Sequence, residues 1–386
     1  MEYLFWLGFV GVGYAYFGYP ALLTLWARVV PRPFRRSTSG WPTVSIVLPA
    51  YNEADKLKAR LENLAETEYL PERIEFIVIS DGSSDDTNII ARNFQATDPR
   101  FRVITLEDRA GKGNALNVGV SSSNADIVVF TDAGISLDAD AIRRIVAPFG
   151  DSEIGCVSGE DWISGSGGEA LYGRYELFLR QQESKVGSLV GASGSFYAQR
   201  RHLVPEFVAG VAPDFHSVLH TVSQGYRAVS EPKARGSMAA TASHTREFRR
   251  KVRTVLRGMT AIARYRHLLN PFRAGSFALV LASHKIARWL VPFFLALMLA
   301  THFLLLGRPF FQFLAFPHLG FYVLAILGLF GNQWLAEKPV ARVPAYFVTV
   351  NAAIAVAALR FVAGVRQELW EPTARKGFPQ SPSSGG

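Results

Sequence analysis

Short apolar runs alternate with amphipathic, helix-length segments over the first third of the chain. Three of the runs lead into a carboxylate: SIVLPAYNE (45–53), EFIVISDGSSDD (75–86) and DIVVFTDAG (126–134). β-Branched runs of this length, separated by helix-length segments, predict parallel strands whose carboxyl ends meet at one edge of a sheet. We therefore expect Glu53, Asp81 and Asp132 to share one crevice.

The segments between the runs have the pattern of crossover helices. KLKARLENLAET places three leucines at helical spacing, and GSSDDTNIIARNF predicts a second helix with Ser84 or Asp85 as its N-cap. FRVITL (101–106) predicts a further strand, and AGKGNALNVGV a glycine-punctuated turn into a helix. Four strands alternating with helices predict a Rossmann-like α/β half.

Longer apolar stretches lie at both ends of the chain. Residues 1–30 are expected to form a retained transmembrane anchor, and three stretches between 276 and 366 are expected to form membrane helices. The arginines of RVVPRPFRR place the amino terminus outside and the globular part in the cytoplasm by the positive-inside rule. The number of C-terminal spans stays open, because Pro317 and Arg360 are awkward in lipid and one stretch would suit an interfacial or re-entrant position.

Composition agrees with a membrane protein that is not a disulfide scaffold. The 386 residues are 49% hydrophobic, carry a net charge of +9 and include one cysteine, Cys156, in an apolar segment typical of a core strand. A single cysteine excludes an internal disulfide and fits a reducing compartment. The positive charge comes without a nucleic-acid recognition module, so no nucleic acid is expected as a partner.

Several motifs together resemble the membrane-embedded members of family 2 of the glycosyltransferases. They are VSIVLPAYNE, IVISDGSSDDT, AGKGNALN, VVFTDAG, GASGSFYAQRR (191–201), PDF followed by GYRAVSEP, and SHKIARWLVPF (283–293). The resemblance implies an α/β fold of the GT-A type, a Rossmann-like mixed sheet flanked by helices, with transmembrane or interfacial helices at both ends. It places a cytoplasmic catalytic domain at 40–240, basic interfacial helices at 241–275, membrane helices at 276–366 and a cytoplasmic or flexible tail at 367–386.

The activity implied is transfer of a sugar, with inversion, from a nucleotide-diphosphate donor to a lipid-linked or glycan acceptor. Such an enzyme would be a multi-pass protein of the inner membrane and would act in cell-envelope or exopolysaccharide synthesis. The alternative is a catalytically impaired relative that binds nucleotide sugar or glycan as a subunit of a synthase. Donor, acceptor, processivity and oligomeric state stay open.

The resemblance assigns donor contacts to the strand ends. Pro49, Tyr51, Glu53 and Asp81 would hold the base and ribose, although Glu53 and Asp81 could instead cap the following helices. Lys112, between two glycines, would meet the diphosphate. In GEDW (159–162), Trp162 is a candidate for contact with the donor sugar or the acceptor.

Asp132 matches the first acid of the family's DxD motif, which usually holds a divalent cation. The second acid is missing, because the triplet is Asp132, Ala133, Gly134. A Mg²⁺ or Mn²⁺ ion is therefore expected only as a half-site at Asp132, since glycine supplies no oxygen ligand. The DAD triplet at 138–140 is rejected as a metal motif, because Asp138 is expected to be the N-cap of an amphipathic helix.

Two further residues are expected to act in catalysis. Asp214 occupies the place of the family's general base at the start of a helix, although Pro213 stands where many relatives have another acid, and a plain N-cap is the alternative. Arg253 matches the arginine of the family's Q-x-x-R-W element, where Arg250 and Thr254 replace the glutamine and the tryptophan. These replacements argue against a processive, cellulose-type synthase. Arg253 would bind the diphosphate or a lipid phosphate, whereas an interfacial basic helix is the alternative.

Overall fold

A computed structural model describes residues 1–386 apart from 38–39, 164–167, 240–243, 337 and 366–386. The side chains of 244, 246, 333 and 336 are also not described. The predicted tail at 367–386 therefore lies outside the described residues.

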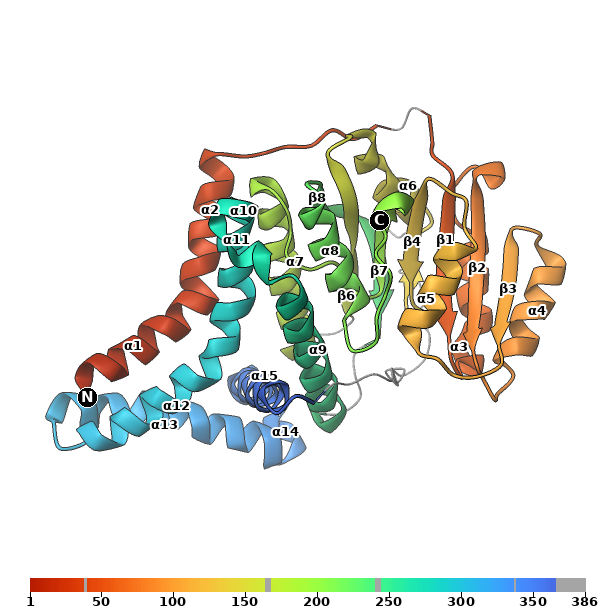
Figure 1. Ribbon diagram of the computed structural model, residues 1–386. Helices are drawn as coiled ribbons and strands as arrows, with labels where there is room; N and C mark the ends of the chain where they lie inside the picture. The colour runs from red at the N-terminus through yellow and green to blue at the C-terminus, as the bar shows by residue number, and fades with distance from the viewer. Residues whose placement is uncertain (38–39, 164–167, 240–243, 337, 366–386) are drawn as a thin grey trace, which may run out of the picture.

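One mixed sheet of eight strands forms the centre of the globular part of the chain (Figure 1). Its order is β3-β2-β1-β4-β7-β6-β8-β5, and β1 to β4 run parallel whereas β7 is antiparallel to both β4 and β6. The predicted mixed α/β sheet is confirmed, and the strand expected at 101–106 has those bounds. The strands are β1 Val44–Ala50, β2 Ile74–Asp81, β3 Phe101–Leu106, β4 Ile127–Thr131, β5 Ser136–Leu137, β6 Ile154–Ile163, β7 Phe196–Arg200 and β8 Arg227–Met238.

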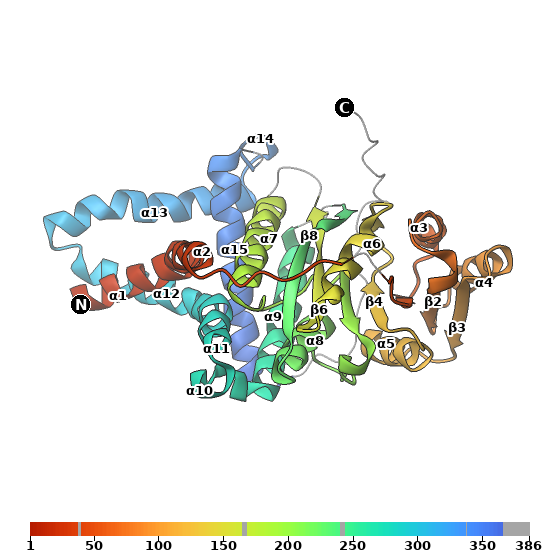
Figure 2. The same ribbon diagram turned by 90° about the horizontal axis from the view of Figure 1, so that it is seen from above.

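Helices cover both faces of this sheet, as Figure 2 shows for α3 and α5. Alternate residues of β1 point to opposite faces, so Ile46 packs with the leucines of α3 while Val47 packs with Leu116 of α5. The flanking helices are α3 Ala54–Ala65, α4 Thr87–Thr97, α5 Lys112–Ser121, α6 Ala141–Val146, α7 Gly168–Val186, α8 Pro213–Ser223 and α9 His244–Arg264.

Two predicted helix starts were wrong. Asp138 is not the N-cap of α6; that position belongs to Asp140. The backbone N–H of Asp138 donates to the carbonyl of Arg235, so Asp138 still lies in the β5–β8 edge of the sheet. The N-cap of α4 is Asp86, neither Ser84 nor Asp85, although the carboxylate of Asp85 accepts the N–H of Thr87, the first residue of the helix, and that of Ala54.

The ends of the chain form a separate helical layer beside the sheet (Figure 1). Three helical stretches in the described part are long and apolar enough to cross a membrane: Ser276–Leu305, Pro309–Phe330 and Pro339–Val362. The first comprises α11 Ser276–Leu281, the π-helix η6 Ala282–Ile286 and α12 Ala287–Leu305; the others are α13 Pro309–Phe330 and α15 Pro339–Val362. The short helices α10 Pro271–Ala274 and α14 Gln333–Ala336 precede α11 and α15.

Of the N-terminal helices, the first two pack along α12 and the third packs against α7 and α11. They are α1 Glu2–Gly13, the π-helix η1 Tyr14–Gly18 and α2 Tyr19–Val29. A Cβ atom at Gly8 would lie 2.8 Å from the carbonyl oxygen of Phe294, so α1 and α12 approach this closely only because residue 8 is glycine. The proposed anchor at 1–30 is not one of the three stretches above and stays a prediction.

Helix α15 connects the helical layer formed by the chain ends to the part that contains the sheet. Ala353 and Ala357 of α15 pack against Val252 and Leu256 of α9. Figure 1 shows α15 along its axis, whereas Figure 2 shows it at full length and steeply inclined to α13. The apolar side of the basic helix α9 is therefore covered by another helix of the same chain.

Candidate active site

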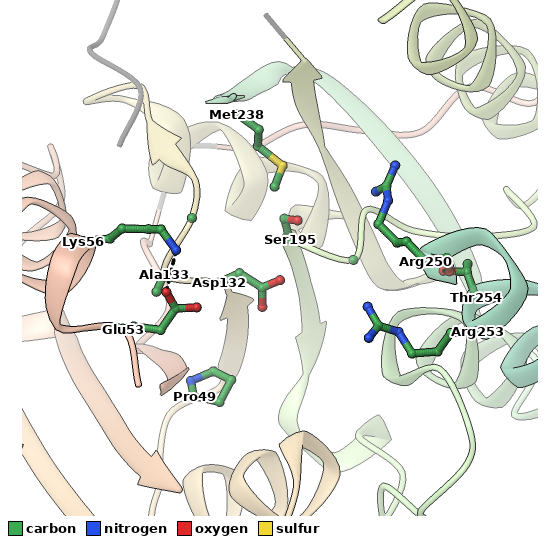
Figure 3. Close-up of a pocket in the computed structure, with 12 residues that line it drawn as sticks. Pro49, Glu53, Lys56, Asp132, Ala133, Ser195, Met238, Arg250, Arg253 and Thr254 are labelled. Atoms are coloured by element: carbon green, nitrogen blue, oxygen red, sulfur yellow. Dashed lines mark hydrogen bonds and ion pairs between the residues drawn. The ribbon is translucent and has the colours of Figure 1, made fainter. Parts of the chain in front are cut away.

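The carboxyl ends of β1 and β4 open into a cavity of about 180 Å³, which we call the donor cavity. Figure 3 shows Glu53 and Asp132 on one side of it and Arg253, from α9, on the other. The structure thus brings two of the three expected acids into one crevice. The lining residues are Pro49, Glu53, Lys56, Asp132, Ala133, Gly134, Gly194, Ser195, Met238, Arg250, Arg253 and Thr254.

Asp81 lies at the same edge of the sheet but is not among the lining residues. It is the last residue of β2, is 1% exposed, and its two carboxylate oxygens accept N–H groups from Ala110 and Gly111, each at 2.8 Å. Gly111, with a φ of 91°, is the N-cap of α5, and this left-handed backbone suits glycine. Asp81 therefore fixes the turn that leads to Lys112, and its contact with a nucleotide stays a prediction.

Glu53 forms a buried ion pair with Lys56, with 2.7 Å between its Oε2 and the lysine Nζ. Glu53 is the N-cap residue of α3, but its side chain makes no capping hydrogen bond. Burial raises the pKa of the Glu53 carboxyl, and Lys56 opposes this shift. Lys56 is a cation of the donor cavity that the sequence pattern did not single out, because it lies within an ordinary amphipathic helix.

Pro49 lines the cavity, and Tyr51 lies just beyond the end of β1. The guanidinium of Arg109 sits 4.0 Å from the centre of the Tyr51 ring. The loops after β1 and β2 are joined where the side chain of Asn52 accepts an N–H group from Ser84 at 2.9 Å. Arg109 had no motif to mark it, so this stacked pair was missed in the sequence.

Lys112 connects two parts of the site. Its Nζ lies 2.5 Å from Oδ1 of Asp132 and 3.4 Å from the carbonyl oxygen of Gly194. Lys112 is the first residue of α5, so its charge lies at the positive end of the dipole of that helix.

The residues around Asp132 fit a protein-held divalent cation poorly. Asp132 is already paired with Lys112, and Gly134 has no side chain. Within the described ranges, no three His, Cys, Asp or Glu side chains gather as a metal site would require. A Cβ atom at Gly134 would meet nothing within 4 Å, so the missing acid leaves open space.

The basic residues of α9 differ in their surroundings. Arg250 pairs with Glu169 at 2.7 Å and with Glu247 at 2.8 Å, and the two carboxylates raise the pKa of this guanidinium against the effect of burial. Arg253, one turn later, extends into the donor cavity (Figure 3). Arg250 therefore anchors α9, and Arg253 faces the strand ends.

Asp214 lies next to the donor cavity, behind Gly194. A Cβ atom on Gly194 would be 3.8 Å from the Asp214 carboxylate. The N-cap of α8 is Ala212, so the alternative of a plain N-cap is wrong. Burial raises the pKa of the Asp214 carboxyl, with Lys112 acting in the opposite direction.

Asp214 also lines a second cavity of about 220 Å³, which meets the donor cavity at Thr254. Trp162 lines neither cavity; it is 41% exposed, and its Nε1 donates to Glu160 at 3.3 Å. The second cavity contains Lys285 and Arg288, which belong to the motif SHKIARWLVPF noted in the sequence. That motif was the available signal for these two cations.

Residues 45–206 match the family model described as glycosyl transferase family 2. These residues form a family 2 glycosyltransferase domain. The match begins in β1 and ends after β7, so it contains Glu53, Asp81, Lys112 and Asp132.

Solved and curated proteins agree with this domain. The fold is that of a mannosyltransferase from Pyrobaculum calidifontis, solved in complex with GDP-Man and Mn²⁺: the TM-score is 0.72 over 93% of this chain and 99% of that chain, at 22% identity. This similarity includes the helices outside the family 2 domain, since it extends over nearly the whole chain.

Two curated relatives illustrate the sequence similarity. Glycosyltransferase AglE of Haloferax volcanii is 28% identical over 145 residues, which cover 38% of this chain and 48% of that protein. A poly-β-1,6-N-acetyl-D-glucosamine synthase of Staphylococcus epidermidis is 30% identical over 162 residues, 40% of this chain and 38% of that protein. The chain thus spans less than half the length of these relatives.

Proposed function

We propose that this protein transfers a sugar from a nucleotide-diphosphate donor to a hydroxyl group of a lipid-linked or glycan acceptor, with inversion. The observation that supports this most directly is the adjacency of Asp214 to the donor cavity. The half-buried carboxylate of Asp214 lies behind Gly194, and Nζ of Lys112 lies within hydrogen-bond distance of Asp132 and of the Gly194 carbonyl. A general base and a cation for the leaving group are the two needs of this reaction.

In the proposed reaction, the acceptor oxygen forms a bond to the anomeric carbon while the bond from that carbon to the diphosphate oxygen breaks. The acceptor proton passes to the Asp214 carboxylate, and the electron pair of the broken bond leaves with the nucleoside diphosphate. Lys112, which contacts the cavity residue Asp132, and Arg253, which lines the cavity, stabilise the charge that develops on the diphosphate.

The donor's nucleotide part would lie at the ends of β1 and β2. Pro49 lines the cavity there, and Tyr51, stacked with Arg109, provides a flat surface beside it. Glu53 would accept hydrogen bonds from ribose hydroxyls, with Lys56 keeping its charge in place. Asp81 would contribute through the turn that it holds, together with any direct contact to the base.

A divalent cation would take Asp132 as its one carboxylate from the DxD position. Its chemistry when bound would be to draw charge from the diphosphate oxygens. Because Gly134 offers no ligand, we assign most of this charge stabilisation to Lys112 and Arg253.

The proposed location is the inner membrane, with several spans and a cytoplasmic catalytic domain at 40–240. The three apolar stretches of the C-terminal region support membrane association. The curated relatives support a role in polysaccharide or glycan synthesis, since one of them is a poly-β-1,6-N-acetyl-D-glucosamine synthase.

The test is nucleotide release from UDP- and GDP-sugars by the purified full chain in detergent, with and without Mn²⁺. We expect release from at least one donor, and a loss of about 10²–10⁴-fold for Asp214→Asn, the range over which a general base contributes. Donor binding without release from any donor would favour the alternative of a binding subunit. Full transfer by Asp214→Asn would contradict the assignment of the base.

A further inference from the structure

The cavity that contains Asp214 connects the donor cavity to a third, apolar cavity. It shares Thr254 with the donor cavity, and it shares Tyr172 and Val350 with a cavity of about 260 Å³. We call the middle space the cationic chamber and the third space the apolar groove. The three spaces follow one another from the strand ends toward the membrane helices.

The apolar groove lies between η1, α7 and α15. Phe17 and Val343 on its rim are exposed, and α15 is one of the apolar helices long enough to cross a membrane. An open groove with this lining is suited to a hydrocarbon chain. Its lining residues are Tyr16, Phe17, Gly168, Leu171, Tyr172, Tyr175, Val343, Tyr346, Phe347 and Val350.

The cationic chamber has four basic side chains against two acidic ones. The basic residues are Arg180, Lys251, Lys285 and Arg288, and the acidic residues are Glu176 and Asp214. Two of the cations already have partners outside this set: Arg180 lies 3.3 Å from Asp161, and Lys251 lies 3.8 Å from Glu247. Within the described residues, Lys285 and Arg288 are the two cations without an acidic partner outside the chamber, and Arg288 pairs with Glu176 inside it.

Arg288 is only partly satisfied although it is 5% exposed. One guanidinium nitrogen, Nη1, pairs with Glu176 and donates to the hydroxyl of Tyr172 at 3.1 Å. Its Nε and Nη2 have no hydrogen-bond partner in the part of the chain that the structure describes. Buried donors of this kind are costly to leave without an acceptor, so the site is suited to a further anion.

Lys285 lines the chamber together with Arg288 and Asp214. Among the side chains that the structure describes, no carboxylate lies within ion-pair distance of its Nζ, which is 5.5 Å from the centre of the Phe215 ring. Tyr172, at the junction with the apolar groove, has Lys251 4.4 Å from its ring centre. Cations thus occupy the stretch between the apolar groove and Asp214.

We propose that the acceptor is a phosphate-bearing lipid whose three parts follow the order of these spaces. Its hydrocarbon chain lies in the apolar groove, its phosphate meets Lys285 and Arg288, and its reacting hydroxyl lies at Asp214. Phosphate is the anion of choice because its oxygens accept several charge-assisted hydrogen bonds from arginine and lysine together. This inference rests on the proposed function and names the class of its acceptor.

The experiment measures binding to the purified full chain in detergent. Farnesyl phosphate has both tail and phosphate, farnesol has the tail alone, and inorganic phosphate has the anion alone. We expect farnesyl phosphate to bind at least about 10-fold more tightly than either, since one charge-assisted contact is worth about this factor. Lys285→Gln should remove most of this advantage while leaving farnesol binding unchanged.

Lys58→Gln is the matched control, because Lys58 is an exposed lysine of α3 far from the chamber in the fold. Phe347→Asn should weaken both farnesyl ligands and leave inorganic phosphate unchanged. Equal affinities for farnesol and farnesyl phosphate, or an unchanged affinity in a folded Lys285→Gln protein, would overturn the proposal.

A second binding measurement, with nucleotides, distinguishes failure of this inference from failure of the proposed function. Binding of GDP and UDP to the donor cavity is measured on the same preparations, and Lys285→Gln should retain it. If nucleotide is bound and released but the phosphate-bearing lipid is not preferred, the proposed transferase function stands and the proposed acceptor class is contradicted. Absence of both nucleotide binding and release would count against the transferase itself.

Discussion

Gly134 is the residue at which this site departs most from the pattern that it resembles. The space beside it is open, so an acid can be introduced there without a clash. We expect Gly134→Asp to bind Mn²⁺ at least about 10-fold more tightly in the presence of GDP or UDP, since it adds an oxygen ligand of the kind such cations prefer. Calorimetric titration of Mn²⁺ measures this change. Gly134→Asn, which has the same size without the charge, is the control; equal effects of both variants would contradict the half-site.

Arg253 and Arg249 lie one turn apart on α9, but only Arg253 lines the donor cavity. Removing a charge-assisted contact to the diphosphate costs about 1.5–3 kcal/mol, so Arg253→Gln should lower kcat/KM for the donor by about 10–100-fold. Arg249 is exposed, and Arg249→Gln should leave kcat/KM unchanged. Steady-state kinetics over a range of donor concentrations checks both. Similar losses for the two variants would indicate a general effect of the charge of α9.

Asp214 couples activity to pH through a raised pKa. As a base it must be ionised, so kcat/KM should fall as the pH drops through this raised value, above the usual aspartate range near 3.9. The folded state binds the proton more tightly than the unfolded state. The protonated carboxyl therefore contributes its full stabilisation of the folded state when the pH is below the pKa of the unfolded state. This contribution is lost as the pH rises through the higher pKa of the folded state.

Asp214→Asn should consequently have a higher Tm than the unchanged protein at neutral pH, and the difference should vanish in acid. Thermal unfolding at several pH values tests this expectation. A lower Tm for Asp214→Asn at neutral pH would mean that the charged form is stabilised in the folded protein.

At the scale of elements, the connection from β2 to α5 depends on one side chain. Asp81 accepts two backbone N–H groups of the turn, and bonds to a charged acceptor contribute about 1.5–3 kcal/mol each. Asp81→Ala should lower the free energy of unfolding by about 2–4 kcal/mol, measured by denaturant titration. Asp86→Ala is the control, because Asp86 is an exposed N-cap residue without a capping hydrogen bond. Equal losses for the two would show that Asp81 does not hold the turn.

The elements themselves were predictable because their signals are local. The alternation of apolar runs and helical stripes led to β1 to β4 and to α3, and the carboxyl-end rule brought Glu53 and Asp132 to one edge. The partners of the polar side chains were not predictable in this way. Whether Asp81 faces a ligand or the turn at Gly111 depends on contacts between β2 and a loop about 30 residues later, which no local pattern encodes. The N-cap predicted at Asp138 was wrong for the same reason, because the position of Asp138 depends on its contact with Arg235, which is distant in the sequence.

At the scale of the whole molecule, the positions of the two chain ends bear on the proposed orientation in a membrane. Glu2 and Arg308 form an ion pair, so the amino terminus and the connection between α12 and α13 lie on one side. The part that contains the sheet lies beside α2 and α11, away from this ion pair (Figure 1). The orientation expected from the arginines after residue 27 stays a prediction.

Thiol labelling with a membrane-impermeant maleimide tests the orientation. Gly307→Cys should react in intact spheroplasts, whereas Lys58→Cys should react only after permeabilisation, because the first lies beside Arg308 and the second on the exposed face of α3. The reverse pattern would contradict the proposed cytoplasmic domain.

Cys156, the single cysteine, is fully buried in β6 beside Gln199 of β7. Burial also raises the pKa of its thiol, so it remains protonated and unreactive while the sheet is intact. An introduced cysteine is therefore the sole reactive thiol without any need to remove the native one. In the unchanged chain, the rate at which Cys156 reacts with a maleimide reports how often the centre of the sheet opens. This rate can be measured in detergent or in a bilayer, where the optical signals of the apolar helices would hide the unfolding of the sheet.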